Sequence, residues 1–304
     1  MSKSFNQTER LIAGFLAKFP FIKSIVKRSY QIINYYLFKR RYTYKTNLSF
    51  FAVNQSGEAF GGYYDKSQVN PSNDLCFFYH AQQKTHHSPS ASSPLLIKIL
   101  NFPQQTLVKE METKAFNWQQ GAKCQWINNE EIIYNDYRND QYVSVIFNAK
   151  KNQEIKIIDY PIYDCFNDQY AFSLNYERLA YLRPDYGYFA SDEITSLPHL
   201  HEDGIYKIDL NSGTKKLFIP LSDAVQGTVD VPDASHLFNH IMISPDGKHF
   251  IFLHRYFLAN GRRFDRLMVA DAEKGQMDCL SDDGMVSHCT WKNNSEIVGW
   301  MHKK

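Results

Sequence analysis

"NHIMISPDGKHFIFLHR" (residues 239–255) sets two apolar runs on either side of a polar turn. Residues 241–243 and 250–253 are strings of residues that favour β-strands. Between them, Pro245 presets the backbone angle that a turn needs, and Gly247 accepts the positive φ that closes it. The stretch therefore predicts a β-hairpin.

The same pattern recurs along the chain. A strand, a polar turn, a second strand, a loop, a third strand, a turn and a fourth strand follow one another from near residues 125, 163, 241 and 288, with a less regular copy over 60–108. Spacings of about 40–50 residues, with insertions, are typical of propeller blades. We therefore predict an all-β fold, a β-propeller of about five four-stranded antiparallel blades in residues 47–304.

The last repeat reaches Lys304 after only two strands, so the last predicted blade is incomplete. The short apolar run 48–53 is expected to pair there. An open propeller leaves exposed sheet edges, which promote aggregation. We therefore expect that the chain is a C-terminally truncated form of a longer propeller.

Residues 1–46 have a different character. Ten Lys or Arg stand against Glu9 alone in residues 1–45, a net charge of +9, so the remainder carries −7 of the total of +2. Apolar residues recur with helical spacing from Leu11 to Leu37, and Pro20 interrupts them. We predict a basic amphipathic arm of two helices or one kinked helix, which docks on an anionic membrane surface or on a protein partner.

Several classes of protein are not expected. No apolar run approaches the roughly 20 residues that span a bilayer, and basic residues interrupt any signal-peptide core. The residues after the arm offer no motif that reads nucleic acid, so no nucleic-acid partner is predicted. We expect a cytoplasmic protein, attached peripherally to the inner membrane through its arm.

Two histidines stand at matching points of successive repeats, His240 before "IMISPDG" and His288 before "CTW". Inner-strand residues of a propeller point into the central channel, so the two imidazoles are expected to converge there. Neutral imidazoles suit a divalent transition metal. The alternative stays open that both histidines only cap inner strands by hydrogen-bonding backbone carbonyls.

The phrases "HIMISPDGKHFIFLHR" (240–255), "RLMVADAEKGQ" (266–276) and "MVSHCTW" (285–291) resemble the TolB-like propeller repeat. They are most similar to its oligogalacturonate lyase branch, metal-dependent enzymes that cleave uronate oligosaccharides by β-elimination. The resemblance implies that His240 and His288 bind one divalent transition metal such as manganese. It also implies catalytic roles for His254 and for Arg255, whose planar fork would clamp the uronate carboxylate. The lyases add a Gln and closely spaced His residues from a later blade, whereas only His302 follows His288 here.

The chain also resembles uncharacterised propeller proteins encoded among cell-surface polysaccharide and glycosyltransferase genes. The matching segments are "WQQGAKCQW" (118–126), "RLAYLRPDYGY" (178–188) and residues 239–255. We therefore expect a saccharide contact by Trp118, Gln119, Gln120, Arg183, Asp185 and Tyr186. The other interpretation is structural: Trp118 at a blade junction, Arg183, Asp185 and Arg255 in ion pairs, and Tyr186 in loop packing.

Three functions follow. The first is a saccharide-binding propeller that works in cell-surface polysaccharide biosynthesis at the inner membrane face. The second is a metal-dependent oligouronate lyase, and the third is a non-catalytic interaction scaffold. No glycosyltransferase motif is present, because the sequence has no Asp-x-Asp at a strand end, no glycine-rich nucleotide loop and no GxSxG. Whether the protein is an enzyme stays open at this point.

Overall fold

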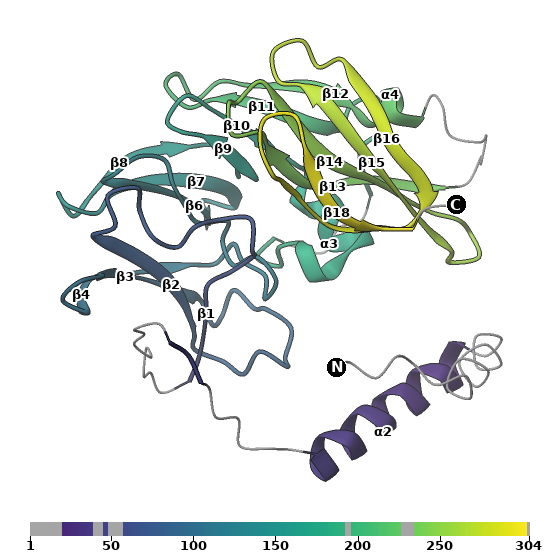
Figure 1. Ribbon diagram of the computed structural model, residues 1–304, viewed down its shortest axis with the longest axis horizontal. Coiled ribbons are helices and arrows are strands. Elements are labelled where there is room, and N and C mark those ends of the chain that lie inside the picture. Colours follow the sequence, from purple (N-terminus) through teal and green to yellow (C-terminus); the bar gives the residue numbers. More distant parts are fainter. Residues whose placement is uncertain (1–19, 39–44, 48–56, 192–195, 226–233, 303–304) are drawn as a thin grey trace. The chain divides into compact units, whose positions relative to one another are not determined.

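The computed structural model describes residues 20–38, 45–47, 57–191, 196–225 and 234–302 (Figure 1). The chain divides into two compact units, Met1–Ala52 and Val53–Lys304. In the first unit, helix α2 (Pro20–Phe38) begins at its proline, which suits a first helical turn because the N–H there needs no intrahelical partner. The helical stretch expected before Pro20 and the strand expected over 48–53 lie outside the described residues.

The described part of the second unit contains five antiparallel sheets, each built from consecutive strands. The first sheet consists of β1 (Glu58–Phe60), β2 (Leu75–Ala81), β3 (Leu95–Asn101) and β4 (Thr106–Thr113), and the second of β5 (Gln125–Trp126), β6 (Glu131–Arg138), β7 (Gln141–Asn148) and β8 (Gln153–Ile158). The third contains β9 (Asp164–Phe166), β10 (Tyr170–Ser173), β11 (Gly204–Asp209) and β12 (Lys215–Pro220). The fourth contains β13 (Ser235–Ile243), β14 (His249–Phe257), β15 (Arg263–Asp271) and β16 (Met277–Gly284), and the fifth β17 (Val286–Trp291) and β18 (Ile297–Met301).

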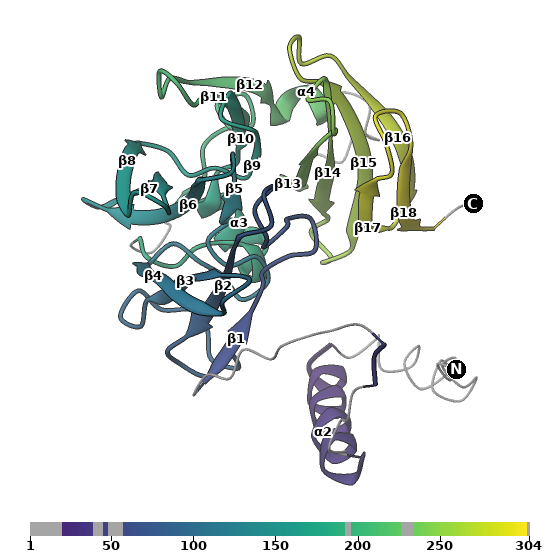
Figure 2. The ribbon, with the colours of Figure 1, turned by 60° about the vertical axis from the view of Figure 1, so that its left-hand side comes forward.

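Apolar clusters join each sheet to the next. Ile97 and Val145 represent the cluster between the first and second sheets, and Ile146 and Ile208 that between the second and third. A large aromatic cluster joins the third and fourth sheets, and Val286 packs against the fourth sheet from the fifth. Burying one face of each sheet against its neighbour is how a propeller builds its core. Figure 2 shows the sheets following one another in an arc, with β5, β9 and β13 toward its inside.

The fold is therefore an all-β propeller, as the repeats predicted, and its described residues form five blades, the last with two strands. The turn "SPDG" forms as expected, because the N–H of Gly247 donates to the carbonyl of Ser244 over 2.9 Å. Gly247 has a φ of +72°, and a Cβ there would lie 2.6 Å from the ring of Phe166 in the preceding blade. Both the backbone angle and the close approach require glycine at this position.

One end of the sheets carries the features that concern function. The chain passes from sheet to sheet there, through residues 114–124 and 159–163, and the loop 82–94 lies at the same end. Instead of a short turn, the third sheet has a long insert there, residues 174–203, with helix α3 (Tyr176–Leu182) and the short helix η1 (Pro184–Tyr186). We call this end the link face. A further short helix, α4 (Leu221–Val225), follows β12.

The insert is tied firmly to the propeller. The side chain of Asn175 caps α3 by accepting from two backbone N–H groups, and the rings of Tyr176 and Tyr188 stack at 4.0 Å between centroids. Arg178 is buried and its Nη2 donates to the carbonyl of Pro198 over 2.6 Å. Because these contacts are buried, the insert is a fixed wall of the link face rather than a loose loop.

Candidate functional site

His240 and His288 occupy equivalent positions on the innermost strands of neighbouring blades. Both have left-handed backbone angles, with φ of 55° and 50°, and each lies at a register shift of its strand pair. Lys123 is equivalent in the second blade and also has a positive φ, 50°. A bulge of this kind turns one side chain out of the regular alternation of a strand, so the repeats aim these residues toward the axis.

Two tyrosines of the first blade lie between the histidines. The ring of Tyr63 stacks on that of His240 at 5.4 Å between centroids, and Tyr64 lies 5.8 Å from His288. All four side chains, together with Asp65, line one small cavity of about 20 Å³. That volume holds about one water molecule. The structure thus brings His240 and His288 to one place, but it leaves no room between them for a sugar.

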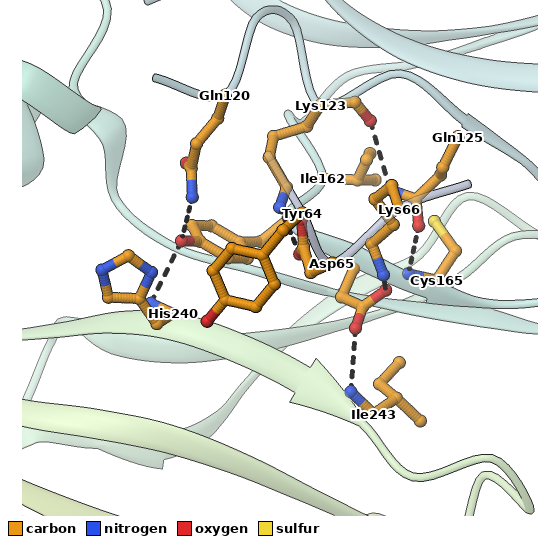
Figure 3. A network of polar contacts seen from close by, with 12 residues as sticks. Tyr64, Asp65, Lys66, Gln120, Lys123, Gln125, Ile162, Cys165, His240 and Ile243 are labelled. Carbon is orange, nitrogen blue, oxygen red and sulfur yellow. Dashed lines mark hydrogen bonds and ion pairs between the residues drawn. The ribbon is translucent and has the colours of Figure 1, made fainter. Parts of the chain in front are cut away.

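Beside His240 lie two buried ion pairs (Figure 3). Lys123 Nζ lies 3.2 Å from Asp65 Oδ2, and Lys66 pairs with Asp164. Asp164 also accepts the backbone N–H of Ile243 over 2.8 Å. Burial alone would raise the pKa of Asp65, but Lys123 and Lys66 outweigh burial and lower it. These charges join four blades and leave neither lysine available as a nucleophile.

Gln120 supports this arrangement from within. It is buried, and its Nε2 donates to the hydroxyl of Tyr163 over 2.8 Å. The same hydroxyl accepts the backbone N–H of His240 over 3.1 Å and donates to Asn239 over 3.0 Å. Gln120 therefore holds the bulge at His240 in place, and the saccharide contact predicted for it has no exposed surface to act through.

His240 itself is a neutral imidazole. Burial, and then the charges of Arg255 and Lys123, lower its pKa to about 3. Neither ring nitrogen hydrogen-bonds to a described residue, so the ring can donate to or accept from a ligand. The edge of the Tyr186 ring lies against it, at 4.9 Å between centroids.

A divalent metal fits this site poorly. Among the described residues, no three His, Cys, Asp or Glu side chains converge as a ligand set. The carboxylate nearest the two imidazoles, Asp65, is already paired with Lys123, and His288 Nδ1 bonds to Ser287 at 2.6 Å. Positive charge around His240 further disfavours a cation. The metal predicted from the resemblance stays a prediction, and no step is derived through it.

His254 is not placed to act on a ligand. Its side chain has no exposed surface, its Nε2 bonds to Nδ1 of His236 at 3.0 Å, and its Nδ1 faces Arg266 Nη1 at 3.3 Å. Burial and then His236 lower the pKa of His254 to about 3. The side chain of His254 thus points into the blade, where both ring nitrogens are engaged, and the catalytic role predicted for it stays a prediction.

Arg255 and Arg183 form the cationic part of the link face. Arg255 is 4% exposed and pairs with Asp265, yet its Nη1 is buried without a hydrogen-bond partner, as is Nε of Arg183. Burial, and then the positive charge of Arg255, lower the pKa of Arg183. Arg183 also lies over the ring of Tyr186, at 5.3 Å from the centroid.

Trp118, Gln119 and Asp185 line a single cavity of about 320 Å³. It lies on the link face, walled by the loop 85–89, the link 117–119 and residues 184–189 of the insert. Trp118 Nε1 donates to the carbonyl of His87 over 2.7 Å, which fixes the indole against the loop. Asp185 connects this cavity with the cationic part, since its Oδ2 lies 3.8 Å from Arg183 Nη2. Three of the six residues predicted to contact a saccharide thus line one cavity.

Sequence reasoning missed several residues of this region. Tyr63 and Tyr64 come from an irregular copy of the repeat, so their place beside the histidines had no signal in the pattern. The equivalence of Lys123 with His288 could have been recognised, because "KCQW" (123–126) aligns with "HCTW" (288–291) of the last repeat. A second cavity, between the second and third blades, was also not foreseen.

No protein-family model matches the chain, and no curated protein matches it in sequence. Among solved structures it is similar to the hydrazine synthase of Kuenenia stuttgartiensis, with a TM-score of 0.41 and 12% identity over 70% of this chain and 52% of that one. It is also similar to TolB from Acinetobacter baumannii, with a TM-score of 0.36 and 12% identity over 74% of this chain and 44% of that one. A third is the β-propeller domain of the Trilobed protease from Pyrococcus furiosus, with a TM-score of 0.37, 9% identity, and coverages of 81% and 70%.

The chain thus spans about half the length of the first two of these proteins. With TM-scores of 0.36 to 0.41, these likenesses carry no argument about this chain. The assignment as a propeller rests on the five sheets themselves and on the apolar clusters that join them.

Proposed function

We propose that this protein binds an anionic saccharide on its link face. The guanidinium groups of Arg183 and Arg255 would hold a carboxylate, and the cavity beside Trp118 would take a neighbouring sugar ring. The proposal combines the residues that the structure gathers there with the resemblance to propellers of polysaccharide genes. In that setting the protein would serve cell-surface polysaccharide biosynthesis as a binding module.

One observation carries the proposal. A buried guanidinium N–H without a partner is costly, because it has lost water and gained nothing in exchange. Arg255 Nη1 and Arg183 Nε are both in that state, and the two groups repel each other. An anion placed between them would satisfy both N–H groups and remove the repulsion. Arginine suits a carboxylate in particular, because its planar fork matches two oxygens.

The surroundings of the two arginines suit a sugar ring as well as its charge. Tyr186, which is partly exposed, presents an aromatic ring beside Arg183, on which the apolar face of a sugar can stack. Asp185 and Gln119 in the adjoining cavity supply further hydrogen-bonding groups.

Binding without chemistry agrees best with the geometry. β-Elimination needs a base beside the sugar C–H, and His254 is engaged inside the blade. The described residues also supply no complete ligand set for the metal that a lyase of the resembling branch would use.

The arm would place this module at a membrane. Helix α2 exposes Ile25, Ile33 and Leu37 by 51%, 55% and 70%, and on a helix these residues share one side. No acidic residue lies within α2, and basic residues continue after it to Lys45. Such a helix fits the interface of an anionic bilayer such as the inner membrane face. None of the helices among the described residues combines the length and hydropathy needed to cross a bilayer.

Titration calorimetry with a galacturonate tetrasaccharide and its carboxyl-reduced counterpart tests the proposal. The protein should prefer the acidic form, and Arg183→Gln should weaken that form alone by roughly tenfold to a hundredfold, the loss of one charge-assisted hydrogen bond. Arg262→Gln, which removes the same charge from an exposed turn of the link face, is the control and should change little. Equal binding of both sugars would contradict recognition of the carboxylate, and no binding of either would leave the scaffold function instead.

A further inference from the structure

We infer that the link face binds an extended heteropolysaccharide, with an acidic sugar at the arginines and an uncharged sugar in a second cavity between the second and third blades. This inference rests on the proposed function and specifies its ligand. Three observations carry it: a second cavity repeats the first, the two cavities share a wall, and the carboxylates of the second cavity are opposite in charge to the arginines.

The second cavity repeats the first one blade further on. Its volume is about 310 Å³, against about 320 Å³ for the cavity beside Trp118. The first is walled by the loop between β2 and β3 and by the link into the second blade. The second uses the equivalent elements, the turn at Asp140 between β6 and β7 and the link at Tyr160. Both volumes lie at the lower end of the roughly 300–1,000 Å³ typical of small-molecule sites.

The two cavities share the insert as a common wall. Phe189 lines the first and Ser191 lines the second, so two residues of backbone, about 7 Å at most, separate them. The hydroxyl of Tyr142 accepts the N–H groups of both Ala190 and Ser191 over 3.1 Å. The wall is therefore fixed and narrow, and a ligand that fills both cavities must be a chain of several sugars that crosses it.

Charge distinguishes the two ends. The second cavity is lined by three carboxylates, those of Asp140, Asp159 and Glu177, and by one cation, Lys215. Lys215 Nζ rests on the ring of Tyr160, 3.7 Å from the centroid, and therefore does not neutralise the carboxylates directly. A uronate would be repelled here, whereas it is attracted to Arg183 and Arg255.

The rest of the lining suits an uncharged sugar. Five tyrosines line the second cavity, namely Tyr137, Tyr142, Tyr160, Tyr176 and Tyr206. All but the buried Tyr176 are partly exposed, and such rings can offer stacking surfaces with a polar tip. The carboxylates accept hydrogen bonds from sugar hydroxyl or amide N–H groups. A polymer that mixes uronate with a neutral or N-acetylated sugar would satisfy both the arginines and the second cavity, whereas a pure uronate polymer would satisfy the arginines alone.

The test compares two hexasaccharides by titration calorimetry, one that alternates glucuronate with N-acetylglucosamine and one of galacturonate only. The intact protein should bind the alternating hexasaccharide at least tenfold more tightly. The variant Asp159→Lys/Glu177→Lys replaces two exposed acids of the second cavity and should lose this preference. Asp168→Lys/Glu273→Lys makes the same charge change at exposed sites outside both cavities and should keep it.

The outcomes separate this inference from the proposed function. If Arg183→Gln weakens both hexasaccharides while Asp159→Lys/Glu177→Lys leaves their ratio unchanged, the anionic site stands and the second cavity is overturned. A preference of the intact protein for the galacturonate hexasaccharide overturns the inference too. If neither hexasaccharide binds, the proposed function fails and the inference falls with it.

Discussion

His240 and His288 sit at the same bulged position of two successive blades, both in the left-handed region of backbone conformation. This conformation is unfavourable for residues other than glycine. Its occurrence at both positions therefore reflects the bulge, which directs one side chain toward the axis. The repeat thus determines the bulged backbone, and the histidines are the side chains present at that position. Several measurable consequences follow from this and from the buried charges around it.

The backbone at His288 should favour glycine. The side chain is exposed, so replacing it loses little packing, and the φ of 50° is then the main difference between substitutions. We expect His288→Gly to be more stable than His288→Ala by about 1 kcal/mol. Urea unfolding of both variants measures the difference, and equal stabilities would show that the bulge relaxes.

The axial ion pair between Lys123 and Asp65 should be sensitive to loss of one partner. Both side chains are almost fully buried, so Lys123→Met leaves a buried carboxylate unpaired and should cost roughly 3–5 kcal/mol of unfolding free energy. The double variant Lys123→Met/Asp65→Leu should recover much of this. Chemical denaturation measures the unfolding free energies of both variants. A double variant no more stable than the single one would contradict a direct pairing.

Acid should destabilise the protein through its buried histidines. Burial and then Arg178 lower the pKa of His236 to about 4, and that of His254 is about 3. At a pH below the usual histidine pKa of about 6.5, these histidines become protonated in the unfolded chain but stay neutral in the folded chain. The free energy of unfolding should therefore fall as the pH drops from about 6.5 to 4, by about 1.4 kcal/mol per pH unit for each such histidine.

Unfolding midpoints between pH 7.5 and 5 measure this slope. The variant His236→Gln should show a shallower dependence, because one of the buried imidazoles is gone. His201→Gln, at an exposed site, is the matched control and should keep the slope of the natural protein. The same slope in both variants would mean that His236 is protonated in the folded state.

Trp118 should contribute to saccharide binding through its ring. It lines the first cavity and its N–H holds the loop at His87. Trp118→Ala should weaken binding of the galacturonate tetrasaccharide about tenfold, whereas Trp118→Phe should lose less because a ring remains. A glycan array or calorimetry reports this, and unchanged affinity in Trp118→Ala would remove the first cavity from the binding site.

Helix α2 should bind anionic vesicles through its apolar side. Ile33→Asp/Leu37→Asp should abolish sedimentation with vesicles of phosphatidylglycerol, because two charges would enter the acyl boundary. Arg28→Gln/Gln31→Glu makes the same change of net charge on the other side of the helix and should weaken binding only modestly. Similar losses in the two variants would indicate that charge alone governs the attachment, and no loss in either would point to a protein partner.

The sequence by itself determined the repeating unit. Apolar β-forming runs alternate with turns such as Ser244–Gly247, and these local preferences suffice to define strands, hairpins and blades. The helix from Pro20 and the matched positions of His240 and His288 could likewise be read, since both depend on local spacing. Such features are encoded by neighbours in the chain.

Only the tertiary structure decided which of these residues meet. Whether His254 faces a ligand or the blade interior depends on its partners His236 and Arg266, and the spacing along the strand does not contain that information. The same holds for Arg183 and Arg255, which lie more than seventy residues apart in the chain and would form the proposed anion site only because the insert packs against the fourth blade. Contacts between blades are set by packing across the axis, and one sequence pattern is compatible with many such pairings.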